Sequence, residues 1–164
     1  MLLYLVRHAM AGDPDPVRWP DDRQRPLTAE GEQELGQGAG GLRRLAAGVD
    51  VVLSSRLARA WQSARILRDA AGWPEPAPLQ ALEPGTPATM LAEALRPHGA
   101  ASSLALVGHE PSLHELASYL LAGDAARVRI VMRPGGVACL TCPDGPRPGR
   151  AALEWLLQPT ILAP

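Results

Sequence analysis

The chain has 164 residues, of which 46% are hydrophobic and 20% are charged, and its formal net charge is −1. This length is sufficient for one core, so we expect residues 1–164 to form a single domain. Because the charge is close to neutral, nothing in it favours a nucleic acid or an anionic membrane, and a small partner is the better expectation. All 16 basic residues are arginines, so any phosphate chemistry must use guanidinium groups.

The chain opens with a short apolar run, Leu2 to Val6, which Arg7 closes. The run is too short for a secretory signal and has no basic residue before it. No segment of the sequence approaches the ~20 apolar residues that a membrane span requires. The two cysteines of the motif CLTC agree with a reducing compartment. We therefore expect a cytoplasmic protein with no membrane partner.

Apolar runs and helical patterns alternate along the chain. The runs at 2–6, 49–53 and 104–107 predict strands that are buried on both faces of a mainly parallel sheet. Apolar residues spaced three or four apart predict helices at 29–47, 57–71, 90–95 and 113–121. Three later segments, at 127–132, 137–142 and 153–157, are expected to complete the sheet, with at least one antiparallel strand. This alternation is typical of the α/β class.

The segment from Gly12 to Pro26 has no apolar period and is rich in proline, aspartate and arginine. A loop of this length in a compact domain is either the rim of an active site or a disordered surface loop, and both interpretations stay open. Its Asp13 and Asp15 suggest an aspartyl-phosphate enzyme, but they do not follow a strand. A solvated loop is the simpler interpretation of these two acids.

Basic residues follow each of the three parallel strands at its carboxyl end. They are Arg7 and His8 after the first strand, Arg56 and Arg59 after the second, and His109 after the third. Open α/β sheets bind ligands at this edge. Guanidinium groups match phosphate oxygens, and a histidine that is neutral near pH 7 is a competent nucleophile. The sequence therefore predicts an anion pocket that contains a reactive histidine.

Three segments at this edge resemble the motifs of a known family. The Arg7-His8 pair, the stretch SSRLARAWQSA and the stretch VGHEPSL resemble, in order, the motif segments of the histidine phosphatase (phosphoglycerate-mutase-like) superfamily. The short length and the segment RPLTAEG resemble its compact bacterial phosphohistidine phosphatase branch. The resemblance covers residues 1 to about 120 and implies a three-layer α/β/α sandwich with one antiparallel strand.

The resemblance also implies a role for each residue of the predicted pocket. His8 would be the nucleophile that becomes phosphorylated, Arg7 and Arg59 would hold the phosphoryl oxygens, and His109 would complete the pocket. The substrate would be phosphohistidine in a protein partner. We expect neither a metal ion nor another cofactor, because arginines can supply the positive field that a divalent ion supplies elsewhere.

The sequence departs from the family pattern at two motif positions. Ala9 stands where glycine is usual, and Arg56 stands where proline is frequent, so the sequence leaves open whether Arg56 also enters the pocket. Glu83 is the only nearby candidate for an acid that protonates a leaving group. Two alternatives to a phosphohistidine phosphatase therefore remain: a phosphatase of small alcohol phosphates, and a catalytically silent module that binds phosphate.

Other motifs are better explained by structure than by chemistry. The sequence GQGAGG at 36–41 follows a helical pattern rather than a strand, so it predicts a close helix contact and not a dinucleotide site. Cys139 and Cys142 lie three apart on a predicted strand and should face opposite sides of the sheet. The histidines of HEPSLH are five apart, which does not match a zinc-binding helix, so His114 is expected to be structural.

Overall fold

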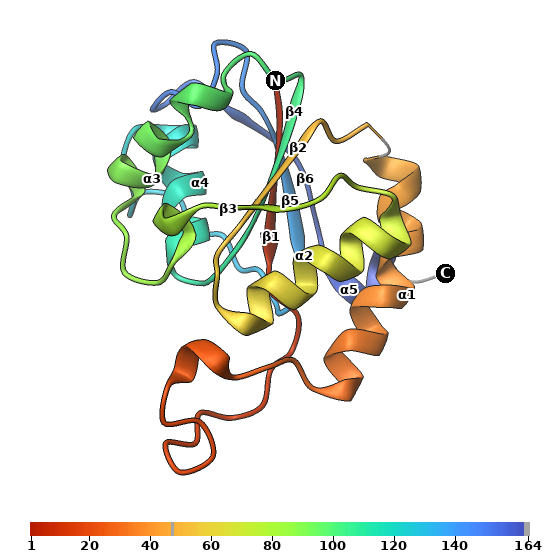
Figure 1. Ribbon diagram of the computed structural model, residues 1–164. Helices are drawn as coiled ribbons and strands as arrows, with labels where there is room; N and C mark the ends of the chain where they lie inside the picture. The colour runs from red at the N-terminus through yellow and green to blue at the C-terminus, as the bar shows by residue number, and fades with distance from the viewer. Residues whose placement is uncertain (47, 163–164) are drawn as a thin grey trace.

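A six-stranded sheet forms the centre of the computed structural model, which describes residues 1–46 and 48–162 (Figure 1). Its spatial order is β3-β2-β4-β1-β5-β6. The strands are β1 (Leu2–Arg7), β2 (Val51–Ser54), β3 (Ala77–Pro78), β4 (Ser103–Gly108), β5 (Val137–Thr141) and β6 (Ala152–Leu157). Strands β3, β2, β4 and β1 run parallel, whereas β5 is antiparallel to both β1 and β6. The predicted mainly parallel sheet with an antiparallel strand is confirmed.

Helices cover both faces of this sheet (Figure 1). One layer contains α1 (Ala29–Leu45), α2 (Ala58–Ala71) and the short α5 (Pro159–Leu162), and the other contains α3 (Ala88–Ala94) and α4 (Ser112–Ala122). Three single 3-10 turns occupy the connections: η1 (Asp22–Gln24), η2 (Gln80–Leu82) and η3 (Arg96–His98). The predicted three-layer α/β/α sandwich is thus confirmed.

The residues of β1 alternate between two hydrophobic cores. Tyr4 and Val6 join the core beneath α1 and α2, whereas Leu3 and Leu5 join the core beneath α3 and α4. Burying one such side chain contributes roughly 1.5–3 kcal/mol. Because both faces of the central strands are buried in this way, β1 is held rigidly and its carboxyl end is well placed to carry a site.

The helix ends follow from local sequence. Thr28 caps α1, since its side chain accepts a hydrogen bond from the Gly31 amide at 3.0 Å. Gly72 and Gly123 end α2 and α4 in the left-handed conformation, with φ of 75° and 76°, which glycine adopts readily. Residue Ala47, at the predicted end of the first helix, lies outside the described residues.

The glycine-rich stretch of α1 packs closely against α5. A Cβ atom at Gly41 would overlap with the carbonyl oxygen of Leu162, and one at Gly38 would contact the side chain of the same leucine. The interpretation of GQGAGG as a close helix contact is therefore confirmed, and a side chain at Gly41 would force the backbone of α5 to shift.

The prediction of a strand at 127–132 is wrong. Burial does alternate along the segment, because Ile130 and Met132 are buried while Val131 is 63% exposed, but the segment forms no strand. Strand β5 is already paired on both edges, with β1 and β6, so this segment has no partner there. It instead passes along the carboxyl end of β1, where Arg7 Nη1 donates to the carbonyl oxygen of Met132 at 2.8 Å.

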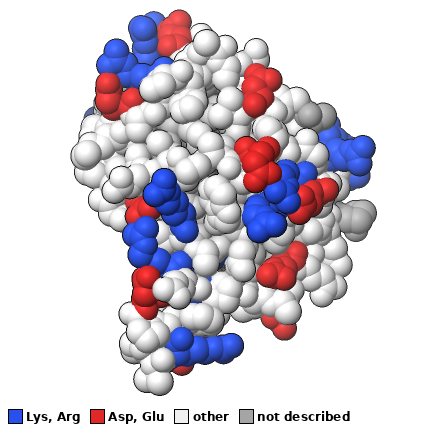
Figure 2. All heavy atoms as spheres, viewed as in Figure 1, with Lys and Arg blue, Asp and Glu red and all other residues white. Residues whose placement is uncertain are grey.

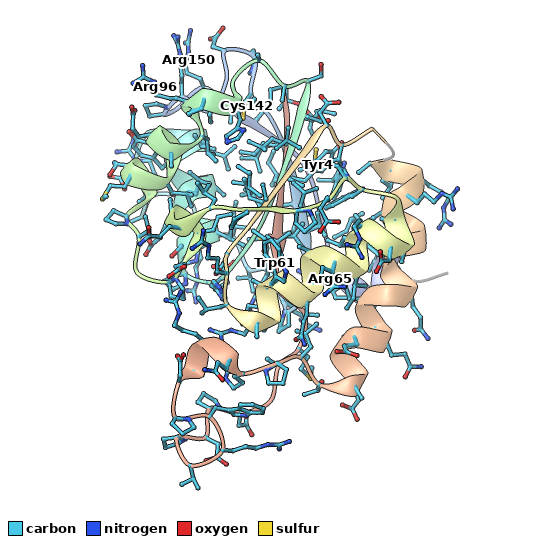
Figure 3. The ribbon with its side chains drawn as sticks, viewed as in Figure 1. Tyr4, Trp61, Arg65, Arg96, Cys142 and Arg150 are labelled. Atoms are coloured by element: carbon cyan, nitrogen blue, oxygen red, sulfur yellow. The ribbon has the colours of Figure 1, made fainter. Side chains whose placement is uncertain are left out.

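Cys139 and Cys142 are both buried and free, and they belong to different cores, as their spacing predicted. Burial raises the pKa of each thiol to about 11. Cys142 lies toward the end of the sheet opposite the 12–26 loop (Figure 3). None of the helices in the described part of the chain is long and apolar enough to cross a membrane.

Candidate active site

Four of the predicted site residues meet at the carboxyl end of the central strands. Arg7 ends β1, His8 follows it, His109 follows β4, and Arg59 lies in the first turn of α2 after β2. The strands β2, β4 and β1 are adjacent and parallel, so these positions are neighbours in space. All four side chains line one cavity of about 450 Å³, which we call the anion cavity.

His8 is oriented by the backbone on either side of it. Its amide donates to the carbonyl oxygen of Gly108 at 3.0 Å, and its ring Nδ1 lies 2.7 Å from the carbonyl oxygen of Ala9. A carbonyl oxygen can only accept, so Nδ1 carries the proton and Nε2 keeps its lone pair. The pKa of His8 is lowered to about 4: burial is the largest cause, the charges of Arg59 and Arg7 act in the same direction, and the bond to Ala9 opposes them. His8 is therefore neutral at pH 7 and can act as a nucleophile through Nε2.

A hydroxyl group joins this histidine segment to α2. Ser63 Oγ accepts from the Ala9 amide at 3.0 Å and donates to the carbonyl oxygen of Arg59 at 2.7 Å. Ser63 is completely buried, so this link is shielded from water. It fixes the residue after His8 relative to the helix turn that carries Arg59, which sets the distance between the two predicted groups.

His109 faces His8 with its ring centroid 5.1 Å away, and its residue is only 3% exposed. Its Nε2 lies 3.0 Å from Ser55 Oγ, which itself accepts from the Leu57 amide at 3.2 Å. The Ser55 hydroxyl has its own proton to donate to Nε2, and in that tautomer the N–H of the His109 ring lies on Nδ1. Burial lowers the pKa of His109 to about 3, and the neighbouring His8 and Arg59 act in the same direction.

Several buried donors at the anion cavity have no partner within the part of the chain that the structure describes. They are Arg7 Nε, Arg59 Nε and His109 Nδ1. A buried donor without an acceptor costs about 1–3 kcal/mol, and more when it is charged. An oxyanion supplies acceptors and opposite charge together, so this donor set fits a phosphoryl group. No group of three or more histidine, cysteine, aspartate or glutamate side chains in the described residues could hold a metal ion.

The 12–26 loop forms the rim of the anion cavity, in keeping with the first of the two interpretations that the sequence left open. Asp22 and Arg25 from this loop line the cavity, and so does Asp13. Asp22 pairs with Arg25 Nε at 2.6 Å and with Arg59 Nη1 at 3.1 Å. These arginines lower the pKa of the Asp22 carboxyl, with the Arg25 hydrogen bond the largest cause. Figure 2 shows basic and acidic side chains close together over the lower part of the molecule, where this loop lies.

Two sequence candidates lie outside the anion cavity, and two residues that the sequence reasoning missed lie at it. Arg56 is exposed and does not line the cavity. Glu83 also stays outside and pairs with Arg23 through both oxygens, at 2.8 and 3.1 Å. Arg25 and Glu110 line the cavity instead. The segment RPLTAEG contains Arg25, and Glu110 lies within the motif VGHEPSL, where only His109 is given a role from the sequence.

Comparisons with known proteins bear on the family and the fold of the chain. Residues 3–83 match the family model of the histidine phosphatase superfamily (branch 1). An uncharacterized protein of Picosynechococcus sp. is 38% identical over 126 residues, which cover 76% of this chain and 75% of that protein. The protein histidine phosphatase SixA, solved with tungstate, has a TM-score of 0.86 at 22% identity, with 99% of each chain covered. A protein proposed to be the phosphohistidine phosphatase SixA of Nakamurella multipartitia has a TM-score of 0.74 at 26% identity, covering 96% of this chain and 95% of that one.

Proposed function

Because the chain belongs to the histidine phosphatase superfamily, we propose that it hydrolyses phosphohistidine in a protein partner through a phosphoryl group carried transiently by His8. The observation that carries this proposal is the state of His8. Its Nδ1 proton is held by the Ala9 carbonyl, its pKa is lowered to about 4, and it lies in a cavity lined by arginines. A neutral imidazole with a free lone pair beside cationic donors is suited to accept a phosphoryl group.

The reaction has two phosphoryl transfers. In the first, His8 Nε2 forms a bond to phosphorus while the bond from phosphorus to the substrate nitrogen breaks. In the second, a water oxygen bonds to phosphorus while the bond from phosphorus to His8 Nε2 breaks; the protons of the water leave with the inorganic phosphate, and the electron pair of the broken bond restores the imidazole. Arg7, Arg59 and the Nδ1–H of His109 stabilise the oxygens of the transferring group in both steps, because their charge and donors are already in place.

The leaving group favours phosphohistidine over an alcohol phosphate. An alkoxide is a poor leaving group and gains ~10²- to 10⁴-fold from a positioned acid. An imidazole departs as a neutral ring whose conjugate acid has a pKa of about 6.5, so it needs less help. Glu83, the acid considered from the sequence, is engaged by Arg23 outside the anion cavity. We therefore rank a phosphatase of small alcohol phosphates second, behind a phosphohistidine phosphatase.

The phosphorylated intermediate can be tested by mass. We expect intact-mass measurement after brief exposure to phosphoimidazole to show one added phosphoryl group on the wild-type chain, and peptide mapping to place it on His8. The variant His8→Ala should gain no mass and show no turnover while keeping its circular dichroism spectrum. Ordinary turnover by His8→Ala would contradict the mechanism.

The substrate class is tested by comparing kcat/KM for phosphoimidazole with kcat/KM for a simple alkyl phosphate. The proposal expects the P–N substrate to be preferred. An efficient alkyl phosphatase with weak activity on phosphoimidazole would instead support the small-molecule candidate.

We also propose that turnover needs no divalent ion. Three arginines line the anion cavity, and guanidinium groups stay charged at any relevant pH, so they supply the positive field themselves. Dialysis against a chelator should leave the rate unchanged. Activity that disappears with chelator and returns with one added metal would overturn this part of the proposal.

A further inference from the structure

A second cavity of about 460 Å³ lies beside the anion cavity, and we call it the side cavity. Two residues, Arg7 and Glu110, line both cavities. The first turns of α4 supply one wall through His114 and Glu115, and the segment 125–132 supplies the other. A group attached to a phosphoryl bound by Arg7 therefore has a neighbouring space in which to lie.

The lining of the side cavity combines apolar surface with one buried acceptor. Val128, Ile130 and Met132 contribute apolar side chains. Glu110 Oε2 accepts from His114 Nδ1 at 2.7 Å, whereas Oε1 is buried without a partner in the described part of the chain. An ionised carboxylate has about four acceptor positions, so this one retains capacity for a further donor. Apolar side chains beside a buried acceptor suit an aromatic ring that carries an N–H group.

The wall of the side cavity is tied to the anion cavity. Arg7 Nη1 donates to the carbonyl oxygen of Met132 at 2.8 Å, so the arginine that faces the phosphoryl group also holds the 125–132 segment in place. Val131 is 63% exposed and Arg129 is also exposed, and both line the cavity. The cavity is therefore open to the surface, as a ring attached to a protein chain requires.

We propose that the side cavity receives the imidazole ring of the phosphorylated protein, and that Glu110 accepts a hydrogen bond from the ring N–H distal to phosphorus. This inference rests on the proposed function and adds the residue that recognises the leaving group. Glu110 acts here as a binding residue for the ring, in contrast to the arginines, which bind the phosphoryl oxygens.

The hydrogen bond to Glu110 assists the first transfer without moving a proton. The substrate ring carries phosphorus on one nitrogen and a proton on the other. When His8 Nε2 bonds to phosphorus, the old P–N bond breaks and its electron pair stays on the ring nitrogen. Because the distal nitrogen keeps its proton, the ring leaves as neutral imidazole. A carboxylate beside that proton favours the protonated, reactive form of the substrate ring.

The test uses two P–N substrates that differ in the ring. Phosphoimidazole carries an imidazole, whereas phosphoramidate carries only an amino group. We expect Glu110→Gln to lower the ratio of kcat/KM for phosphoimidazole to kcat/KM for phosphoramidate about five- to tenfold. Glutamine can still accept from His114, so the fold should be retained. Glu93→Gln makes the same chemical change on the exposed face of α3, where Glu93 pairs only with Arg96 at 2.6 Å, and should leave the ratio unchanged.

A second variant tests the space itself. Ala126 is an exposed residue that lines the side cavity, so Ala126→Trp fills the cavity without disturbing the core. It should lower the same ratio at least tenfold, mainly through KM for phosphoimidazole. If both variants keep the wild-type ratio while the wild-type chain hydrolyses phosphoimidazole, the assignment of the side cavity is wrong and the proposed function stands. If the wild-type chain hydrolyses alkyl phosphates but not phosphoimidazole, the proposed function fails, and the assignment fails with it.

Discussion

The floor of the anion cavity and its rim are held in place by different interactions. The floor consists of Arg7, His8, Arg59 and His109, which are anchored at the ends of buried strands and the first turn of α2. The rim is the 12–26 loop, whose Asp22 is 50% exposed and is held by ion pairs. Burial of the floor lowers the pKa values of both histidines, whereas partly exposed ion pairs contribute little to stability. The comparison predicts that chemistry depends on the floor and that the rim adjusts affinity.

The largest expected difference in activity is between a variant of the floor and a variant of the rim. His8→Ala should reduce turnover to background, since it removes the nucleophile. Arg25→Ala removes one of three arginines at the cavity and should reduce kcat/KM for phosphoimidazole by ~10²-fold. Steady-state kinetics of the two purified variants measures both values. Equal losses would remove the proposed distinction between floor and rim.

The floor should also make stability depend on pH. The folded pKa values of His8 and His109 are about 4 and about 3, below the value of about 6.5 expected in the unfolded chain. The unfolded state therefore binds more protons as the pH falls below 6.5, and stability is lost from there down to about pH 4 for His8 and about pH 3 for His109. Each histidine adds a slope of at most ~1.4 kcal/mol per pH unit.

This slope can be assigned to His8 by thermal unfolding at pH 7 and pH 5. The wild-type Tm should be lower at pH 5 than at pH 7. This difference should be smaller in His8→Ala, which lacks one of the two histidine rings of the floor. The rim variant Arg25→Ala should keep the wild-type slope. An unchanged pH dependence in His8→Ala would mean that this ring is not buried in a neutral form.

A smaller effect is expected for the group that orients His109. Ser55→Ala removes the hydroxyl that lies 3.0 Å from His109 Nε2 and leaves the ring to choose its tautomer. We expect kcat to fall about fivefold, in keeping with ~1 kcal/mol for a neutral hydrogen bond, with little change in KM. Ser54→Ala is a matched control, because Ser54 is equally buried and its hydroxyl bonds the backbone of Ser55 instead of the histidine.

At the rim, Asp22→Asn should strengthen anion binding. The Asp22 carboxylate lines the anion cavity and repels a phosphoryl group, at a cost of about 1 kcal/mol for charges 4 Å apart in water. Product inhibition by inorganic phosphate should therefore become about fivefold tighter. Weaker inhibition would show that Asp22 matters more for orienting Arg25 and Arg59 than for its own charge.

The smallest effect is expected at Glu83. Glu83→Gln weakens the pair with Arg23, whose side chain is 54% exposed, and such a pair contributes at most ~1 kcal/mol to the position of the loop. We expect kcat/KM for phosphoimidazole to change less than twofold. A large loss confined to alkyl phosphates would make Glu83 an acid and favour the small-molecule candidate.

The floor could be predicted from sequence because its residues follow directly from short apolar runs. A buried parallel strand fixes where its last residue lies, so the sequence alone predicts Arg7, His8 and His109 at one edge of the sheet. The rim could not be placed in this way. The position of the rim depends on side-chain pairs such as Asp22 with Arg59 and on the isolated β-bridge between Ala11 and Leu27. No local sequence pattern connects the residues that these contacts join.

The 127–132 segment shows a second limit of the sequence pattern. Alternation indicates which side chains are buried, and Ile130 and Met132 are buried here. It does not report whether a strand has a neighbour with which to pair, and here β1 and β6 already occupy both edges of β5. Glu110 was overlooked for a related reason, because its partner His114 and its cavity are defined only by the packed fold.

The buried cysteines make the molecule convenient for site-specific labelling. Cys139 and Cys142 are the only thiols in the sequence, and with pKa values of about 11 they hold almost no thiolate at pH 7 and react slowly with maleimides. A cysteine introduced at Val17, which is 89% exposed in the 12–26 loop, would therefore react selectively in the otherwise unmodified chain. An environment-sensitive fluorophore at that position would report directly on how the loop responds when phosphate binds.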